Sequence, residues 1–92
     1  MKNYKEIIYN KIKDGLSPDS LEVLDESEKH LGHAGYREGG QTHFKVIVVA
    51  PVFSGQSRVA RQRMVYDLLK QELEERVHAL SITARAPGEE LN

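Results

Sequence analysis

The strongest pattern in this chain is the run of apolar residues at positions 42–50. Between Phe44 and Ala50 the only polar residue is Lys45, and four of the residues are β-branched aliphatics. A short, nearly continuous apolar run predicts a strand that is buried on most of both faces and lies inside a sheet. Pro51 ends the run because proline cannot donate to a strand ladder. We therefore expect residues 42–50 to form the central strand of a small sheet.

Upstream, the pattern changes to helical spacing. Four apolar residues recur at intervals of three and four, and charged residues fill the opposite face: Tyr4, Ile7, Ile8 and Ile12. This spacing predicts a short amphipathic helix that ends at Gly15. A turn around Pro18 then leads into residues 21–25, whose imperfect alternation predicts an edge strand.

Downstream, residues 58–75 have the spacing of a long helix. One stripe of this helix is apolar: Ala60, Met64, Val65, Leu68, Leu69 and Leu73. Such a stripe predicts core packing. Residues 51–57 are expected to form a turn with Phe53 as its apolar anchor. Ser54 and Ser57 are both candidate N-caps, so a single helical turn is expected before the main helix. Residues 77–85 alternate as a third strand. A polar tail follows from Pro87 and is expected to fray.

Residues 29–41 show no periodicity. They contain four glycines together with His30 and His33. Loops of this length are uncommon inside compact domains and often carry function, although an ordinary hairpin connection is the alternative.

The expected topology brings the histidines together. A loop connection makes the first two strands antiparallel, and a long helix between the second and third makes them parallel. His43, His78 and the loop histidines His30 and His33 then converge on one end of the sheet. Neutral imidazoles bind zinc, copper, iron or nickel, so this end is a candidate metal site. A hydrogen-bonding surface role is the alternative for each histidine.

Composition narrows the function. The 92 residues make one small domain with 13 basic and 14 acidic residues, so any nucleic-acid binding needs a local basic patch. The absence of cysteine excludes disulfides, cysteine zinc sites and a cluster held by this chain's own thiolates. No apolar run approaches membrane-spanning length, and the N-terminus resembles no targeting signal, so we expect a cytoplasmic protein without membrane contact. No catalytic motif is present, which predicts that the protein is not an enzyme.

Four blocks of the sequence, in order and spacing, closely resemble those of the BolA family. They are residues 42–46 (THFKV), 53–57 (FSGQS), 61–66 (RQRMVY) and 77–81 (VHALS). The resemblance covers about residues 3–86 of a single domain over residues 1–92, with 87–92 as its polar C-terminal tail. The main departure is Gln62, where the family commonly has histidine, so no role of a helix histidine carries over.

The resemblance implies an α/β (α+β) fold like a class II KH domain, with the order α-β-β-α-α-β. Helices would cover one face of a three-stranded mixed sheet, in agreement with the topology expected above. It also implies a partner, a monothiol glutaredoxin, with which the protein would share a [2Fe-2S] cluster. The function would be cluster binding, trafficking or assembly and iron-linked regulation, with no cluster when the protein is alone.

The resemblance also implies the ligands. One family ligand is a histidine near the start of the third strand, which matches His78. The other is a Cys or His in the loop between the first two strands, where His33 is the best match and His30 the fallback. This places the chain in the histidine-loop branch, with His43 as a supporting or structural neighbour. Thiolates from the glutaredoxin and its glutathione would complete the ligand set, and protonation of the imidazoles would oppose binding.

A second function implied by the resemblance is DNA-binding transcription regulation. Arg58, Arg61 and Arg63 lie near the start of the main helix, where a helix N-terminus favours phosphate. Against this stand the net charge of −1 and the turn at residues 53–57 (FSGQS), which has one glycine in place of the Gly-x-x-Gly loop of KH domains. A solvated arginine face or docking to an acidic protein surface are the alternatives.

Overall fold

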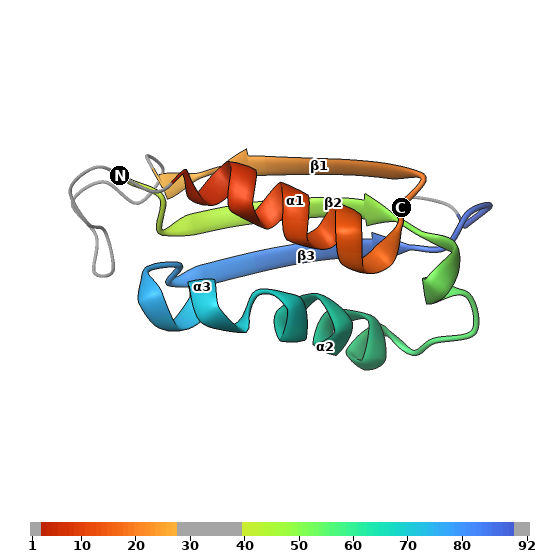
Figure 1. The fold of residues 1–92 in the computed structure, drawn as a ribbon. Coiled ribbons are helices and arrows are strands. Elements are labelled where there is room, and N and C mark those ends of the chain that lie inside the picture. Colours follow the sequence, from red (N-terminus) through yellow and green to blue (C-terminus); the bar gives the residue numbers. More distant parts are fainter. Residues whose placement is uncertain (1–2, 28–39, 90–92) are drawn as a thin grey trace.

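Three strands form one mixed sheet in the computed structural model, which describes residues 3–27 and 40–89 (Figure 1). The strands are β1 (Ser20–Asp25), β2 (His43–Val49) and β3 (Ala79–Arg85), in the order β1-β2-β3. β2 pairs antiparallel with β1 and parallel with β3. The central strand and both pairing directions are therefore confirmed.

The helices also follow the expected order. They are α1 (Tyr4–Leu16), the 3-10 turn η2 (Pro51–Phe53), α2 (Arg58–Leu68) and α3 (Lys70–Glu75). The Ser57 side chain caps α2 by accepting from the Ala60 N–H at 3.0 Å. The long helix predicted over residues 58–75 is interrupted at Leu69, whose N–H is shared between the carbonyls of Val65 and Tyr66. Among the described residues, no helix is both long and apolar enough to span a membrane.

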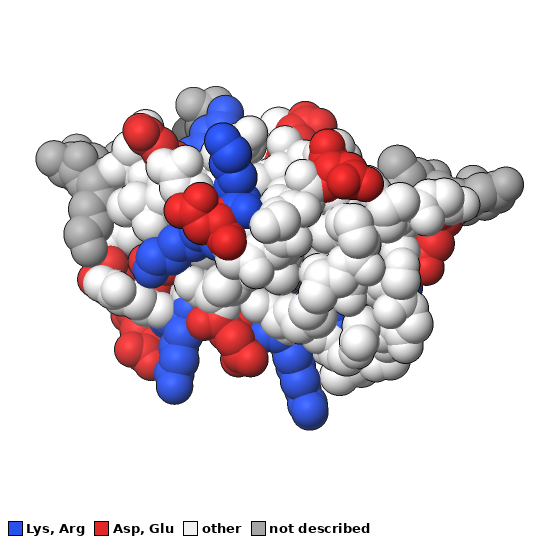
Figure 2. Space-filling model, turned by 45° about the vertical axis from the view of Figure 1, so that its right-hand side comes forward, with Lys and Arg blue, Asp and Glu red and all other residues white. Residues whose placement is uncertain are grey.

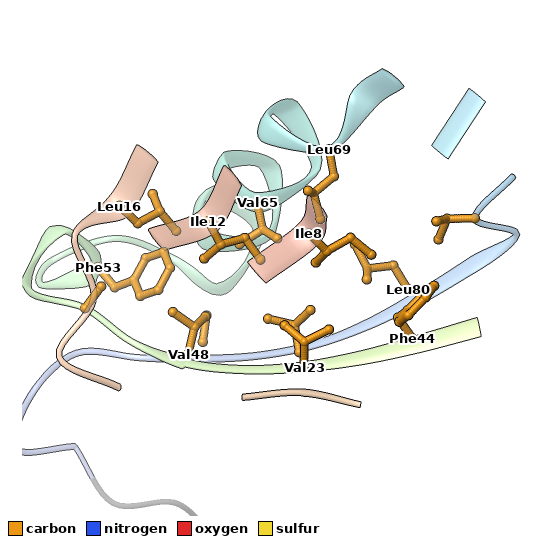
Figure 3. Packing of buried hydrophobic residues seen from close by; sticks show 14 of the residues in the cluster. Ile8, Ile12, Leu16, Val23, Phe44, Val48, Phe53, Val65, Leu69 and Leu80 are labelled. Carbon is orange, nitrogen blue, oxygen red and sulfur yellow. The ribbon is translucent and has the colours of Figure 1, made fainter. Parts of the chain in front are cut away.

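One face of the sheet carries the core. Phe44, Val46 and Val48 of β2 are buried beneath the helices, and Figure 3 shows the side chains of α1 and α2 meeting those of the sheet. The alternate residues Lys45, Ile47 and Val49 are only half-buried. The expectation that β2 is buried on most of both faces is therefore wrong, because the described helices cover the side of the sheet that bears Phe44.

Gly15 does not end α1, contrary to expectation. The helix runs one residue further, and Ser17 takes the left-handed conformation (φ 47°) with its N–H bonded to the Lys13 carbonyl. A Cβ at position 15 would lie 2.6 Å from Cδ2 of Leu68. The glycine is explained by the close packing of α1 against α2.

This contact predicts how Gly15→Ala behaves. Alanine at an interior helix position gains about 1 kcal/mol over glycine, but here the new methyl group must displace Leu68. We expect the gain to be cancelled in the wild type and recovered, at about 1 kcal/mol, in a Leu68→Ala background. Urea unfolding of the four proteins measures this coupling. Equal effects of Gly15→Ala in the two backgrounds would show that the contact is unimportant.

Candidate functional site

Parallel pairing of β2 with β3 brings two histidines together at one end of the sheet. The Thr42 carbonyl accepts hydrogen bonds from the N–H groups of His78, at 2.6 Å, and Ala79, at 3.1 Å. The rings of His43 and His78 lie 5.5 Å apart between centroids, tilted by 54°. Their predicted convergence is confirmed, whereas His30 and His33 lie outside the described residues.

His43 is held in place by its neighbours. It is 7% exposed, and its Nδ1 lies 2.8 Å from the hydroxyl of Thr42. The buried Ser27 hydroxyl accepts from the N–H groups of Thr42 and His43 and donates to Asp25 Oδ1 at 2.6 Å. This network, from β1 to the start of β2, fixes the His43 backbone and ring beside His78.

His78 has the opposite character. Its side chain is exposed, and it lies just before β3, where the backbone is fixed by the bond to Thr42. An exposed imidazole on a fixed backbone can offer a nitrogen to a metal supplied from outside the chain.

Arg76, which no sequence motif singles out, holds the backbone where the described chain resumes at Gly40. Arg76 donates from Nε, at 3.0 Å, and Nη2, at 2.6 Å, to the carbonyl of Gly40. Gly40 and Gln41 both have positive φ, and the Gln41 side chain accepts from the Tyr4 N–H at 2.7 Å. The described chain therefore resumes, after residue 39, at a turn that Arg76 holds in place. A lone arginine between a helix and a strand carries no signal for such a partner.

The described side chains do not complete a metal site on their own. Within residues 3–27 and 40–89, no group of three or more His, Cys, Asp or Glu side chains could hold a metal ion. A [2Fe-2S] cluster needs four ligands. The residues fit such a cluster only as contributors, with His78 as the accessible donor and the other ligands coming from elsewhere.

The three arginines predicted to bind nucleic acid do not form one free patch. Arg58 and Arg63 are exposed. Arg61, in contrast, donates two hydrogen bonds to the Glu89 carboxylate, from Nη1 to Oε1 at 2.6 Å and from Nη2 to Oε2 at 2.8 Å. Its Nε also donates to the Gln56 carbonyl at 3.0 Å. Figure 2 shows a face on which basic and acidic side chains are interspersed. The nucleic-acid prediction thus rests on two exposed arginines.

The expectation that the polar tail frays from Pro87 onward is wrong for residues 87–89. After the turn at Pro87 and Gly88, the Glu89 N–H bonds to the Ala86 carbonyl at 3.1 Å, and Oε1 accepts from the Ala86 N–H at 2.9 Å. The chain is therefore folded back onto α2 as far as Glu89.

The hydrogen bonds of Glu89 predict that the stability of the protein depends on pH. Hydrogen bonds from Arg61 and then from the Ala86 N–H lower the pKa of Glu89 from 4.5 to about 2. A lowered pKa in the folded state stabilises the protein above pH 4.5, and this contribution is lost as the pH falls toward 2. We expect the wild type to melt at a higher temperature than Glu89→Gln at pH 6, with the difference shrinking steadily below pH 4.5. A difference that is independent of pH, measured by circular dichroism, would contradict the assignment.

Comparison with known proteins identifies the family. The family model for BolA-like proteins matches residues 12–89. A Sinorhizobium protein encoded in the cobS 5' region is 45% identical over 85 residues, which are 91% of each chain. SufE-like protein 1 of Arabidopsis thaliana, a chloroplastic and mitochondrial protein, is 45% identical over 86 residues, although these are only 23% of its length. The solved BolA domain of SufE1 from the same plant superposes with a TM-score of 0.86 at 41% identity, covering 98% of this chain and 99% of that domain. The chain therefore belongs to the BolA-like protein family.

Proposed function

We propose that this chain is a non-enzymatic partner of a monothiol glutaredoxin and lends imidazole ligands to a [2Fe-2S] cluster that the two proteins share. The observation that carries the proposal is the placement of His78, which is exposed and fixed beside the buried His43. His33 is the proposed second ligand, because the described residues on either side of its segment lie near these histidines. Ser27 bonds to the His43 N–H, and Gly40 bonds to Arg76, two residues before His78. The biological role would be cluster delivery and iron-linked regulation in the cytoplasm.

The chemistry requires a second protein. Two imidazoles leave half of the four ligand positions of a [2Fe-2S] cluster open, and this chain has no cysteine. Thiolates from the glutaredoxin and its glutathione would fill those positions. When bound, the cluster supplies electron-transfer or iron-carrying capacity, while this chain would hold neutral imidazole nitrogens toward it.

Reconstitution tests the proposal. The chain is mixed with a monothiol glutaredoxin, glutathione, iron and sulfide, and visible absorption and circular dichroism are recorded after gel filtration. We expect a one-to-one complex whose spectrum differs from that of the glutaredoxin alone, and no cluster on this chain alone. An unchanged glutaredoxin spectrum without co-elution would refute the proposal.

We favour this function over DNA binding for a structural reason. One of the three predicted arginines, Arg61, is already paired with Glu89, and the net charge of the chain is −1. A protein that binds nucleic acid gains most of its affinity from neutralising phosphates, so loss of a free arginine weakens that alternative.

The salt dependence of the affinity for DNA tests the DNA-binding alternative. An affinity for duplex DNA whose log–log slope falls when Arg58 and Arg63 are replaced would support regulation through DNA.

A further inference from the structure

A second surface lies at the other end of β3. A hollow of about 430 Å³ runs between α2 and the outer edge of β3. Its lining, as far as the structure describes it, includes three arginines and two glutamines: Arg58, Arg61, Arg85, Gln56 and Gln62. We call this hollow the arginine groove. In a chain with nearly balanced charge, such a lining marks a local site for a negatively charged ligand.

The floor of the arginine groove is a strand edge. Among the described strands, β3 pairs with β2 alone, through groups such as the Ala79 N–H and the Arg85 carbonyl. Backbone groups alternate in direction along a strand, so those of Leu80, Ile82 and Ala84 point outward. Side chains of α2 already bond two of these outward carbonyls, Tyr66 to Leu80 and Arg61 to Ala84, each at 3.2 Å.

Ile82 lies between these two bonded positions and lines the groove. Among the described residues, no side chain bonds to its backbone N–H or carbonyl. The backbone of the half-buried Ile82, between the covered positions Leu80 and Ala84, is available to bond to an extended peptide. The groove therefore offers main-chain groups at its centre and guanidinium groups around them.

The chain itself shows which chemistry the arginines accept. Glu89 folds back, and its carboxylate receives the parallel bonds of the Arg61 fork at 2.6 and 2.8 Å. This two-bond geometry is the preferred way in which arginine binds a carboxylate. Arg58 lines the same groove and is exposed, and no bond of its guanidinium is found among the described residues.

We propose that the arginine groove binds an extended acidic segment of a partner protein, whose carboxylates take the place of Glu89 on Arg61 and bind Arg58. Glu89 would act as a built-in competitor that covers Arg61 in the free chain. A peptide fits better than nucleic acid because the groove combines the edge of a strand with a guanidinium group that already binds a carboxylate. In addition, the protein has no net positive charge to attract nucleic acid. The proposal does not depend on the cluster, since β3 separates the groove from His78.

The test uses the chain alone, without glutaredoxin. The probe is a fluorescein-labelled ten-residue peptide of alternating Glu and Val, titrated at low salt and followed by fluorescence anisotropy. Arg58→Glu should weaken binding at least tenfold. The matched control is Arg63→Glu, the same charge change on the exposed part of the same helix outside the groove, and it should weaken binding less than threefold.

Two further measurements address the mechanism. Glu89→Gln should tighten binding about threefold, because an exposed ion pair that competes for Arg61 is removed. In heteronuclear NMR spectra, the Ile82 amide should shift on addition of peptide, while the amide of Val23 on the opposite edge strand should not.

Several results would overturn the proposal. Equal losses from Arg58→Glu and Arg63→Glu would indicate general charge attraction. Equal binding of a peptide with Gln in place of Glu would remove the carboxylate requirement. Tighter binding of a single-stranded oligonucleotide of the same charge, with the same dependence on Arg58, would make the groove a nucleic-acid site.

Discussion

Replacing His78 with alanine is expected to abolish the spectrum of the mixed complex with a monothiol glutaredoxin. The side chain is exposed, so the folded structure should survive, but an accessible nitrogen donor is lost from the site. Loss of a residue that merely supports a ligand typically costs about 10- to 100-fold in metal affinity, and loss of the ligand itself should exceed this. Visible circular dichroism of the reconstituted complex measures the effect.

Two variants separate ligation from structure at this position. His78→Cys restores a donor and should restore a cluster, with a lower reduction potential because thiolate replaces imidazole. His43→Ala should weaken cluster binding by only about tenfold, since its ring contacts His78 and Thr42 without being the proposed donor. If the complex is unaffected by His78→Ala but lost in His43→Ala, then His43 is the ligand and His78 is the supporting residue.

The second large effect is on stability. Replacing Lys11 with methionine is expected to lower the free energy of unfolding by about 2 kcal/mol. Lys11 Nζ lies 2.7 Å from Oε2 of Glu72, a residue that is 2% exposed and whose Oε1 has no hydrogen-bond partner among the described residues. The substitution leaves this buried charge unpaired, which is more costly than losing an exposed pair. Urea unfolding followed by circular dichroism measures the change.

Two controls show whether the cost comes from the unpaired carboxylate. Lys5→Met, an exposed position on the same helix, should change stability by less than about 0.5 kcal/mol. The double variant Lys11→Met with Glu72→Leu should recover most of the loss, because it removes the buried charge along with its partner. A double variant as unstable as the sum of the two single variants would point to packing as the cause.

Hydrophobic pattern was enough to predict most of the fold. The run at residues 42–50 placed the central strand, and loop and helix connections set the direction of its two neighbours. The pattern failed where a backbone position depends on a distant contact. Glycine commonly ends a helix, but Gly15 lies inside α1, and glycine is needed there because Leu68 of α2 packs against it. The break at Leu69 lies inside an apolar stripe whose spacing continues unchanged.

The site was predictable in place but not in detail. Topology alone brought His43 and His78 to one end of the sheet. The hydrogen bond from Thr42 to Ser27 joins residues that are 15 positions apart, and the bond from Arg76 to Gly40 joins residues that are 36 positions apart. No local sequence pattern encodes such pairs. The same holds for Glu89, whose sequence neighbours predict a loose polar tail although Arg61 holds it.

In the proposed complex, this chain would donate histidine nitrogen to the shared cluster. Pulsed electron paramagnetic resonance of the reduced complex tests it most directly, with ¹⁵N-labelled histidine in this chain and unlabelled glutaredoxin. We predict strong ¹⁵N couplings to the cluster in the wild type, with the His78 coupling absent in His78→Ala. A reduced cluster without any ¹⁵N coupling from this chain would contradict the account.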